Sequence, residues 1–281
     1  MGFFKFLTFC FLSLSLTALA QLYKQPYTLG ISIGISGYEG DIETPLSALD
    51  SNTRPAIGVY ATAHLNSRLS FTLFGTATAV KAIDSLSHNA YWRRRNLNFN
   101  SILFDGGLRF EFNFLPYLVR QRKIAWAPYL STGLALTYFN PKGTYNDETY
   151  ALRDAITNVE KPKKGISPIA FTPCLGGGIK YNYAKSFSIG VHFDYRYIQT
   201  DYLDDISGTY TDPNQFSGQQ DAEIQVILHD PSVLKDSEGL AVLGKQRASN
   251  AINDAYWVLC VTGSYTFKKA HCPFPIPQSR Y

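Results

Sequence analysis

The chain has 281 residues, of which 17% are charged and 15% aromatic, and its formal net charge is +4. A soluble domain carries about 25% charged residues, so the charge content is low for that class. The mild positive charge argues against a nucleic-acid partner. The 19 Tyr and 19 Phe residues, against a single Met, favour strands over helices.

Residues 1–20 have the layout of a secretory signal peptide. Lys5 precedes an apolar run, and small residues form an A-x-A cleavage site just before Gln21. A membrane-anchoring helix is the alternative, but the run is short and the small residues stand where cleavage needs them. Past Gln21 no stretch approaches the ~18 apolar residues of a transmembrane helix. We therefore expect a signal peptide at 1–20 and a mature domain at 21–268.

Eight segments then alternate apolar and small or polar residues at every second position, which is the strand pattern. Each covers about ten residues, the length that a tilted strand needs to cross a bilayer. In the fourth segment, Leu108 and Phe110 alternate with Arg109 and Glu111. The eight segments are 27–37, 56–65, 68–79, 99–114, 128–139, 172–183, 186–197 and 255–267.

A soluble β-sandwich also alternates, and it is the alternative fold. Two features argue against it. The non-apolar face is crowded with Gly, Ser and Thr, which suits a narrow interior better than a solvated surface. Short links at 66–68 and 184–186 and a moderate one, "LPYLVRQRKIAWAP" (115–128), alternate with long links, which describes an outer-membrane barrel. The long links are 39–53, 81–97, 140–167 and 199–254.

The predicted fold is therefore all-β, an eight-stranded antiparallel transmembrane β-barrel with long extracellular loops. An even strand count places both termini in the periplasm, and a sheet in lipid must close. Aromatic residues are expected to form girdles at the two membrane interfaces. These girdle candidates are Tyr117, Tyr129, Tyr138, Tyr183, Tyr195, Tyr197 and Trp257.

The interior of an eight-stranded barrel is just wide enough for side chains to fill it. Inward charges are then expected to pair, because an unpaired buried charge is costly. The expected network consists of Arg109, Glu111, Lys180, His192, Asp194 and Arg196. Three glycines, Gly176 to Gly178, are interpreted as a strand thinned for close packing and not as a phosphate loop.

Catalysis by His192 with Asp194 is the functional alternative, because both face inward and a His with an acid partner can act as a base. No recognisable nucleophile motif accompanies them, and a packed lumen gives a substrate no route in. The sequence has no H-E-x-x-H motif, no P-loop and no paired C-x-x-C. We expect no enzyme activity, no metal and no cofactor.

The loops carry two further features. Loop 199–254 has ten acidic and three basic residues, and its stretch 237–251 could form a short helix. The loop before the fourth segment contains Arg93, Arg94 and Arg95, interpreted as a solvated basic loop, with contact to lipid phosphates as a further option.

The predicted periplasmic side is basic and ends in a proline-containing tail, residues 269–281. Cys272 lies in this tail, in an oxidising compartment that permits disulfides. It is either part of an ordinary tail or the link of a docking peptide to a partner chain. The other mature cysteines, Cys174 and Cys260, have lumen-side parity. The docking candidates are Arg120, Arg122, Lys123, Lys268, Lys269 and Cys272.

Four stretches resemble one known family. The most specific lies in 182–210 and contains "TDYLDDISGTY"; the others are "YTLGISIGISGYEGDI" (27–42), "FDGGLRFEFNFLPY" (104–117) and "PYLSTGLALTYFNPKG" (128–143). They resemble the PorG-like outer-membrane barrel component of the type IX secretion system of Bacteroidetes. The long loops match this family poorly.

The resemblance implies a barrel that is neither an enzyme nor the translocation pore. It would tie a periplasmic ring, built of a lipoprotein and its partner protein, to the outer membrane. The alternative from the residues alone is a free-standing small barrel in outer-membrane lipid, either passive or a surface adhesin acting through loop 199–254.

Overall fold

The computed structural model describes residues 27–42, 52–117, 126–153, 167–184, 186–206, 209–210, 212–216, 222–235, 247 and 253–267. The expected signal peptide (1–20) and tail (269–281) lie outside these ranges. The strands are β1 Tyr27–Glu39, β2 Arg54–His64, β3 Leu69–Ile83, β4 Asn98–Asn113, β5 Trp126–Tyr145, β6 Glu148–Ala151, β7 Ile169–Asn182, β8 Phe187–Tyr197 and β9 Ala255–Thr266. The helical segments are η2 Asp84–Leu86, α3 Ala90–Arg95, η4 Pro213–Phe216, α5 Ala222–His229 and η5 Pro231–Leu234.

Eight of these strands form a closed barrel. Neighbours pair in the order β4-β3-β2-β1-β9-β8-β7-β5, and β4 also pairs with β5, which joins the two ends of the sheet. Every pairing is antiparallel, including that of the first strand with the last. The short strand β6 pairs with the end of β5 beyond its contact with β7. The predicted eight-stranded antiparallel barrel is confirmed.

The outer face of the barrel is apolar. On β1, Leu29, Ile31 and Ile33 are 50–61% exposed, and outward residues such as Leu108 on β4 and Val261 on β9 are exposed to similar degrees. A belt of this size is not tolerated in water, whereas closure pairs the backbone groups that lipid could not satisfy. The barrel is thus built to stand in a membrane. No helix among the described segments is long and apolar enough to cross one.

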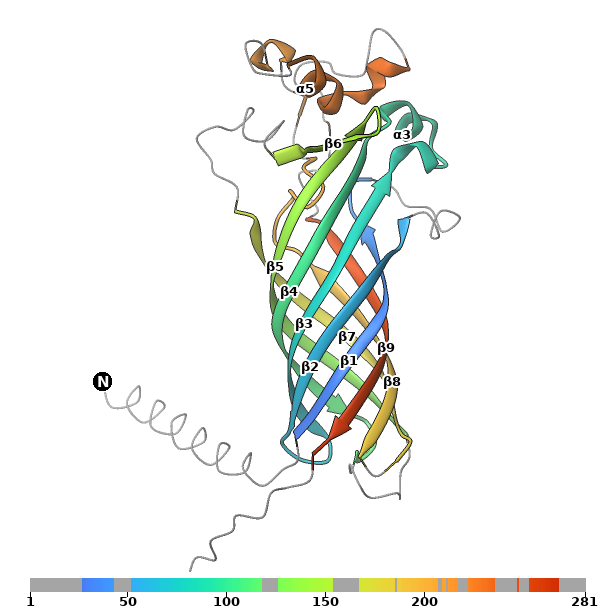
Figure 1. Ribbon diagram of the computed structural model, residues 1–281, viewed down its shortest axis with the longest axis vertical. Helices are drawn as coiled ribbons and strands as arrows, with labels where there is room; N and C mark the ends of the chain where they lie inside the picture. Colours follow the sequence, from blue (N-terminus) through green and yellow to red (C-terminus); the bar gives the residue numbers. More distant parts are fainter. Residues whose placement is uncertain are drawn as a thin grey trace, which may run out of the picture.

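The two ends of the barrel differ. β1 begins and β9 ends at the lower end in Figure 1, where the β2–β3 and β7–β8 connections also lie. The opposite end carries α3, β6 and α5. We call this upper assembly the cap: described residues 38–42, 84–97, 145–153, 198–206, 209–210, 212–216, 222–235, 247 and 253–254.

Two long links begin later in the structure than the sequence suggests. β3 continues to Ile83, and β5 continues to Tyr145 before a hairpin returns as β6. At the hairpin tip Asn146 and Asp147 have positive φ angles of 49° and 63°, which is the backbone of a tight hairpin turn. The stretch 140–151 is therefore mainly strand, because Asn and Asp adopt this conformation readily.

The cap end of the barrel is closed by an apolar core. Inward side chains from the upper parts of the strands pack against side chains of the cap. The core includes Tyr38, Val80, Leu97, Phe99, Leu103, Phe139, Leu152, Ile198, Leu203, Ile206, Leu228, Tyr256 and Val258. The interior therefore changes along the barrel from charged and polar in the middle to apolar at the cap.

Candidate functional site

Seven side chains of Asp, Glu, His, Lys and Arg lie in the middle of the lumen, and we call them the lumen network. Inward positions alternate along each strand, so three strands supply them all. Six are fully buried residues, and the side chain of Lys180 is 17% exposed. They are Asp105, Arg109 and Glu111 on β4, Lys180 on β7, and His192, Asp194 and Arg196 on β8.

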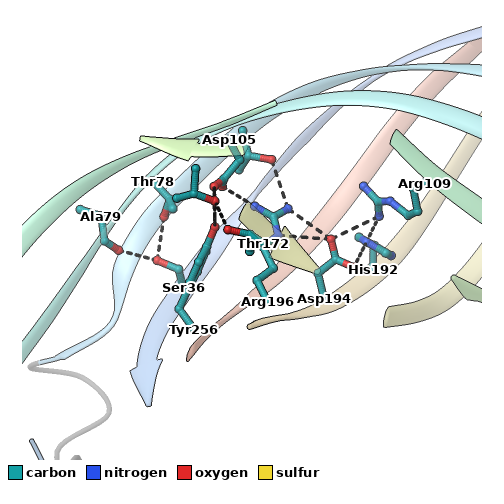
Figure 2. A network of polar contacts seen from close by, with 12 residues as sticks. Ser36, Thr78, Ala79, Asp105, Arg109, Thr172, His192, Asp194, Arg196 and Tyr256 are labelled. Carbon is teal, nitrogen blue, oxygen red and sulfur yellow. Dashed lines mark hydrogen bonds and ion pairs between the residues drawn. The ribbon is translucent and has the colours of Figure 1, made fainter. Parts of the chain in front are cut away.

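Arg196 joins two carboxylates at the upper part of the network (Figure 2). Its Nη1 donates to Asp105 Oδ2 at 2.5 Å, and its Nη2 donates to Asp194 Oδ2 at 3.2 Å. The other oxygen of Asp105 accepts hydrogen bonds from the Tyr256 hydroxyl at 2.5 Å and from Thr137 Oγ1 at 2.7 Å. Both oxygens of this buried carboxylate are therefore satisfied, as a buried charge requires.

Arg109 and His192 lie below Asp194. Arg109 Nη1 donates to His192 Nε2 and lies 3.6 Å from Asp194 Oδ2. The other ring nitrogen, His192 Nδ1, lies 2.8 Å from the Tyr129 hydroxyl, and the two rings are stacked. Because a guanidinium can only donate, this contact fits a neutral imidazole ring for His192.

Lys180 and Glu111 form the lowest ion pair of the network. Glu111 Oε1 also accepts a hydrogen bond from Thr72 Oγ1 at 2.8 Å. With His192 neutral, the lumen network contains three cations and three carboxylates, so it adds no net charge to the membrane span. Such compensation is what allows ionised groups to stay inside a barrel wall.

Glycines on the neighbouring strand make room for this network. A Cβ atom on Gly176 would lie 2.3 Å from Asp194 Oδ1, and one on Gly178 would lie 2.9 Å from the Tyr129 hydroxyl. Both distances are too short for any side chain. The interpretation of this glycine run as a strand thinned for close packing is confirmed. The pocket among the described residues of the lumen network holds about 40 Å³, so side chains fill the lumen at this level.

The cap contains a buried ion pair of its own. Arg95, at the end of α3, donates to the two oxygens of Asp84 at 2.6 and 2.9 Å, and neither side chain is exposed. Asp84 Oδ2 also accepts a hydrogen bond from the Leu97 backbone amide at 3.1 Å. Arg95 also donates to the backbone carbonyls of Asp41 and Arg247. One guanidinium thus ties together four segments of the cap.

A second buried cluster in the cap is acidic. The Tyr38 hydroxyl lies 2.6 Å from Asp204 Oδ2 and 2.8 Å from Asp254 Oδ1. Asp204 Oδ1 accepts a hydrogen bond from the Ile206 backbone amide, and Asp254 Oδ2 accepts one from the Leu203 backbone amide. Burial raises the pKa of Asp204 to about 7, and burial together with the Asp204 charge raises the pKa of Asp254 as well. The pair therefore holds a proton at mildly acidic pH.

Comparison with known proteins identifies a family. The Domain of unknown function DUF6089 matches residues 5–225, which is most of the chain. The chain belongs to the DUF6089 family. No curated protein matches it.

Several solved β-barrels are similar to this DUF6089 chain. Neisserial surface protein A is 10% identical with a TM-score of 0.43, and the match covers 86% of this chain and 97% of that protein. OprG of Pseudomonas aeruginosa is 10% identical with a TM-score of 0.39, and the match covers 86% of this chain and 97% of OprG. Ail of Yersinia pestis is 8% identical with a TM-score of 0.39, and the match covers 86% of this chain and 99% of Ail. Because these scores are below 0.5, the fold assignment depends on the strand pairing alone.

The DUF6089 barrel brings together all six charged residues expected inside it. The sequence analysis missed Asp105, which lies four residues before Arg109 on the same strand and shares its inward parity. It also missed the hydroxyl partners Tyr256 and Thr137. The alternation itself could have identified these residues, because it assigns every second residue of a strand to the lumen, including those beyond the first charged position.

Two of the expected girdle residues are placed differently. Tyr117 and Tyr129 are 6% and 7% exposed and point inward, where their hydroxyls contact Ser188 Oγ and His192 Nδ1. Tyr129 has the inward parity of Ser131 on β5, and its hydroxyl is better satisfied beside an imidazole than in lipid. Tyr138, Tyr183 and Tyr197 are exposed, as girdle residues should be.

The prediction that the basic loop is solvated is wrong for one of its three arginines. Arg95 is fully buried against Asp84, whereas Arg93 and Arg94 are exposed on the same helix. The six-residue helix α3 turns Arg95 toward the barrel, and Asn96 ends it with a φ angle of 61°. The expected helix at 237–251 lies outside the described residues except for Arg247.

Cys174 and Cys260 are free and buried, on β7 and β9. The docking candidates Arg120, Arg122, Lys123, Lys268, Lys269 and Cys272 all lie outside the described residues.

The lumen network offers little chemistry. Because Arg109 occupies His192 Nε2 and Tyr129 occupies Nδ1, neither ring nitrogen faces a substrate site. Among the described residues, no group of three or more His, Cys, Asp or Glu side chains could hold a metal ion. The arrangement is that of a structural network, which fixes the strands and fills the lumen.

Proposed function

We propose that this DUF6089 chain is a non-enzymatic outer-membrane barrel that anchors a periplasmic ring complex of the type IX protein secretion system. The observation that carries the proposal is the filled lumen, with about 40 Å³ of free space beneath an apolar core. A barrel sealed in this way does not conduct solutes or cargo. Its function then lies in the surfaces at its two ends.

The end with the short connections is the proposed docking surface. If both termini face the periplasm, the tail 269–281 and the basic residues Lys268, Lys269 and Arg120 emerge on the side where a ring of secretion-system subunits would sit. The four stretches that resemble the PorG-like family support this assignment. Three of them correspond to β1, β4 and β5, and the fourth covers β8 and Asp204 of the acidic cluster.

A second candidate function is a free-standing barrel that binds a surface partner through its cap. The ordered cap favours it, since Asp84, Arg95 and Tyr38 hold the cap segments together with buried hydrogen bonds. A loop with no role of its own has no need of such contacts. The two candidates use opposite ends of the molecule and are separable by experiment.

The experiment is purification of the tagged protein from its own outer membrane in mild detergent, followed by gels with and without reductant. We expect a periplasmic lipoprotein to co-purify, in a larger band that collapses on reduction and is absent in a Cys272→Ser variant. Cys174→Ser is the matched control, because Cys174 is buried in the barrel and its loss should leave the larger band intact.

A lone monomer in both lanes, from wild type and control alike, would refute the anchoring function. The second test is deletion of 269–281 beside deletion of the cap segment 212–235. Anchoring requires that the first deletion abolish co-purification and the second leave it unchanged; the reverse result supports the surface-binding alternative.

A further inference from the structure

The cap encloses a cavity of about 290 Å³ that is separate from the lumen. It lies between the start of β4, the β5–β6 hairpin and the α5–η5 segment. Its lining is mixed: aliphatic side chains share it with three asparagines, a threonine, a tyrosine and one arginine. The lining residues are Asn96, Leu97, Asn98, Thr144, Tyr145, Asn146, Leu152, Ile206, Ile227, Leu228, Pro231, Leu234 and Arg247.

Arg247 is the exceptional member of this lining. The residue is 3% exposed, yet its side chain forms no ion pair with any described residue, and Arg247 Nε has no hydrogen-bond partner among them. Other deeply buried arginines differ: Arg95 pairs with Asp84, and Arg196 pairs with Asp105 and Asp194. A buried cation without a counter-ion is costly, so an anion is expected to complete the site.

The position of Arg247 is fixed from outside the cavity. Arg95 Nη1 donates to the Arg247 backbone carbonyl at 3.2 Å, and Arg95 itself is held by the buried carboxylate of Asp84. Asp230 precedes the lining residue Pro231, and its Oδ1 accepts from the Ser232 amide and hydroxyl. The Asn98 side chain is satisfied too, through the Thr144 backbone.

The remaining walls select for an apolar body. Leu97, Leu152, Ile206 and Leu228 line one part of the cavity and are 2–6% exposed, and a hydrated inorganic anion would leave their apolar side chains without a partner. Ligand pockets combine such walls with one or a few placed polar groups, and their volumes begin near 300 Å³. The cavity thus fits a small molecule with one anionic end.

We propose that this cavity binds a small amphipathic carboxylate, such as a medium-chain fatty acid, with the carboxylate paired to Arg247 and the chain against the leucines. The site lies at the end of the barrel opposite the proposed docking surface. Its occupancy is therefore independent of the anchoring function, and each proposal can fail without the other.

The test uses the full mature protein in lipid nanodiscs, titrated calorimetrically with octanoate against empty nanodiscs. We expect saturable binding by wild type and by Arg94→Gln, the matched control, which removes an exposed arginine from α3. Arg247→Gln should bind about thirtyfold more weakly or worse, because it removes the cation from a buried pair. 1-Octanol, which has the same chain without the charge, should show no saturable binding.

Two further measurements keep the proposal decidable if Arg247→Gln alters folding. Leu234→Trp fills the cavity from a position that is 51% exposed, so it should abolish octanoate binding while the circular dichroism spectrum stays unchanged. Without octanoate, Arg247→Gln should slow amide hydrogen exchange in the cap, because it removes an uncompensated charge.

Four outcomes would overturn the proposal: no saturable octanoate binding by wild type, equal binding by Arg247→Gln, equal binding of 1-octanol, or faster exchange of the ligand-free variant.

Discussion

The lumen network and the cap both bury several carboxylates, but they neutralise them in different ways. In the lumen, Asp105, Glu111 and Asp194 are matched by three cations. In the cap Asp84 is paired with an arginine, whereas Asp204 and Asp254 share the hydroxyl of Tyr38 and are neutralised by a proton instead. The comparison teaches that the barrel should be insensitive to pH near neutrality and that the cap should respond to it.

Loss of a lumen cation should have the largest effect. Arg196→Met leaves Asp105 and Asp194 without their shared guanidinium, so we expect the free energy of unfolding to fall by about 3–5 kcal/mol. The measurement is urea-induced unfolding of the barrel in lipid vesicles. The control is Arg68→Met, which removes an exposed arginine from the β2–β3 turn and should change stability by less than about 0.5 kcal/mol. Equal effects of the two variants would contradict the structural role of the network.

The corresponding change in the cap should be somewhat smaller and should stay local. Asp84→Asn leaves the fully buried Arg95 without a carboxylate, at a cost of about 3 kcal/mol. Amide hydrogen exchange in α3 should accelerate while the urea midpoint of the barrel does not move. Asp147→Asn is the control, because Asp147 is exposed at a hairpin tip that Asn also suits. A lowered barrel midpoint in Asp84→Asn would show that cap and lumen are one cooperative unit.

The smallest effect should be the pH response of the cap. The pKa of Asp204 rises from 3.8 to about 7 on folding, so the folded cap holds a proton that the unfolded segment releases. This stabilisation is complete below about pH 4 and is lost as pH rises toward 7. Between pH 5 and 8, exchange of the Leu203 and Ile206 amides, corrected for intrinsic rates, should accelerate about a hundredfold, because about two units of the pKa shift lie between pH 5 and the folded pKa of Asp204.

Asp204→Asn should flatten this dependence, because the amide keeps the oxygen that accepts from Ile206 but carries no titrating proton. Lumen amides such as that of Asp194 should show no change over the same range. A cap that becomes more stable as pH rises would contradict the shared-proton arrangement.

Most of the barrel could be predicted from the sequence because its pattern is local and redundant. Alternation along β4 and β8 places Arg109 and His192 inside without knowledge of which strands are neighbours. The sequence could not show which charged residues pair with each other, since Asp105 and Arg196 meet only when β4 and β8 curve around the same lumen. The inward turn of Tyr129 depends in the same way on a partner from another strand.

The cap was less accessible to prediction for a physical reason. Its segments have no repeating pattern, and their placement depends on single contacts such as Arg95 with Asp84. A run of three consecutive arginines is predicted to be solvated, and only the helix in which they lie shows that their side chains point in different directions. Likewise, Asp204 and Asp254 lie 50 residues apart in the chain and acquire their shared Tyr38 only through the fold.

The pairing of β1 with β9 has a consequence for how the molecule is made. Thr28 hydrogen-bonds to Thr266, so the seam of the barrel joins residues that are 238 positions apart. Hairpins such as β2–β3 can form early, but the final seam waits for the whole polypeptide, and contacts of such long range are slow to form. A chain that stops before Ala255 keeps two open strand edges and cannot complete membrane insertion. Synthesis must therefore finish before assembly can, and the chain needs to be kept unfolded in the meantime.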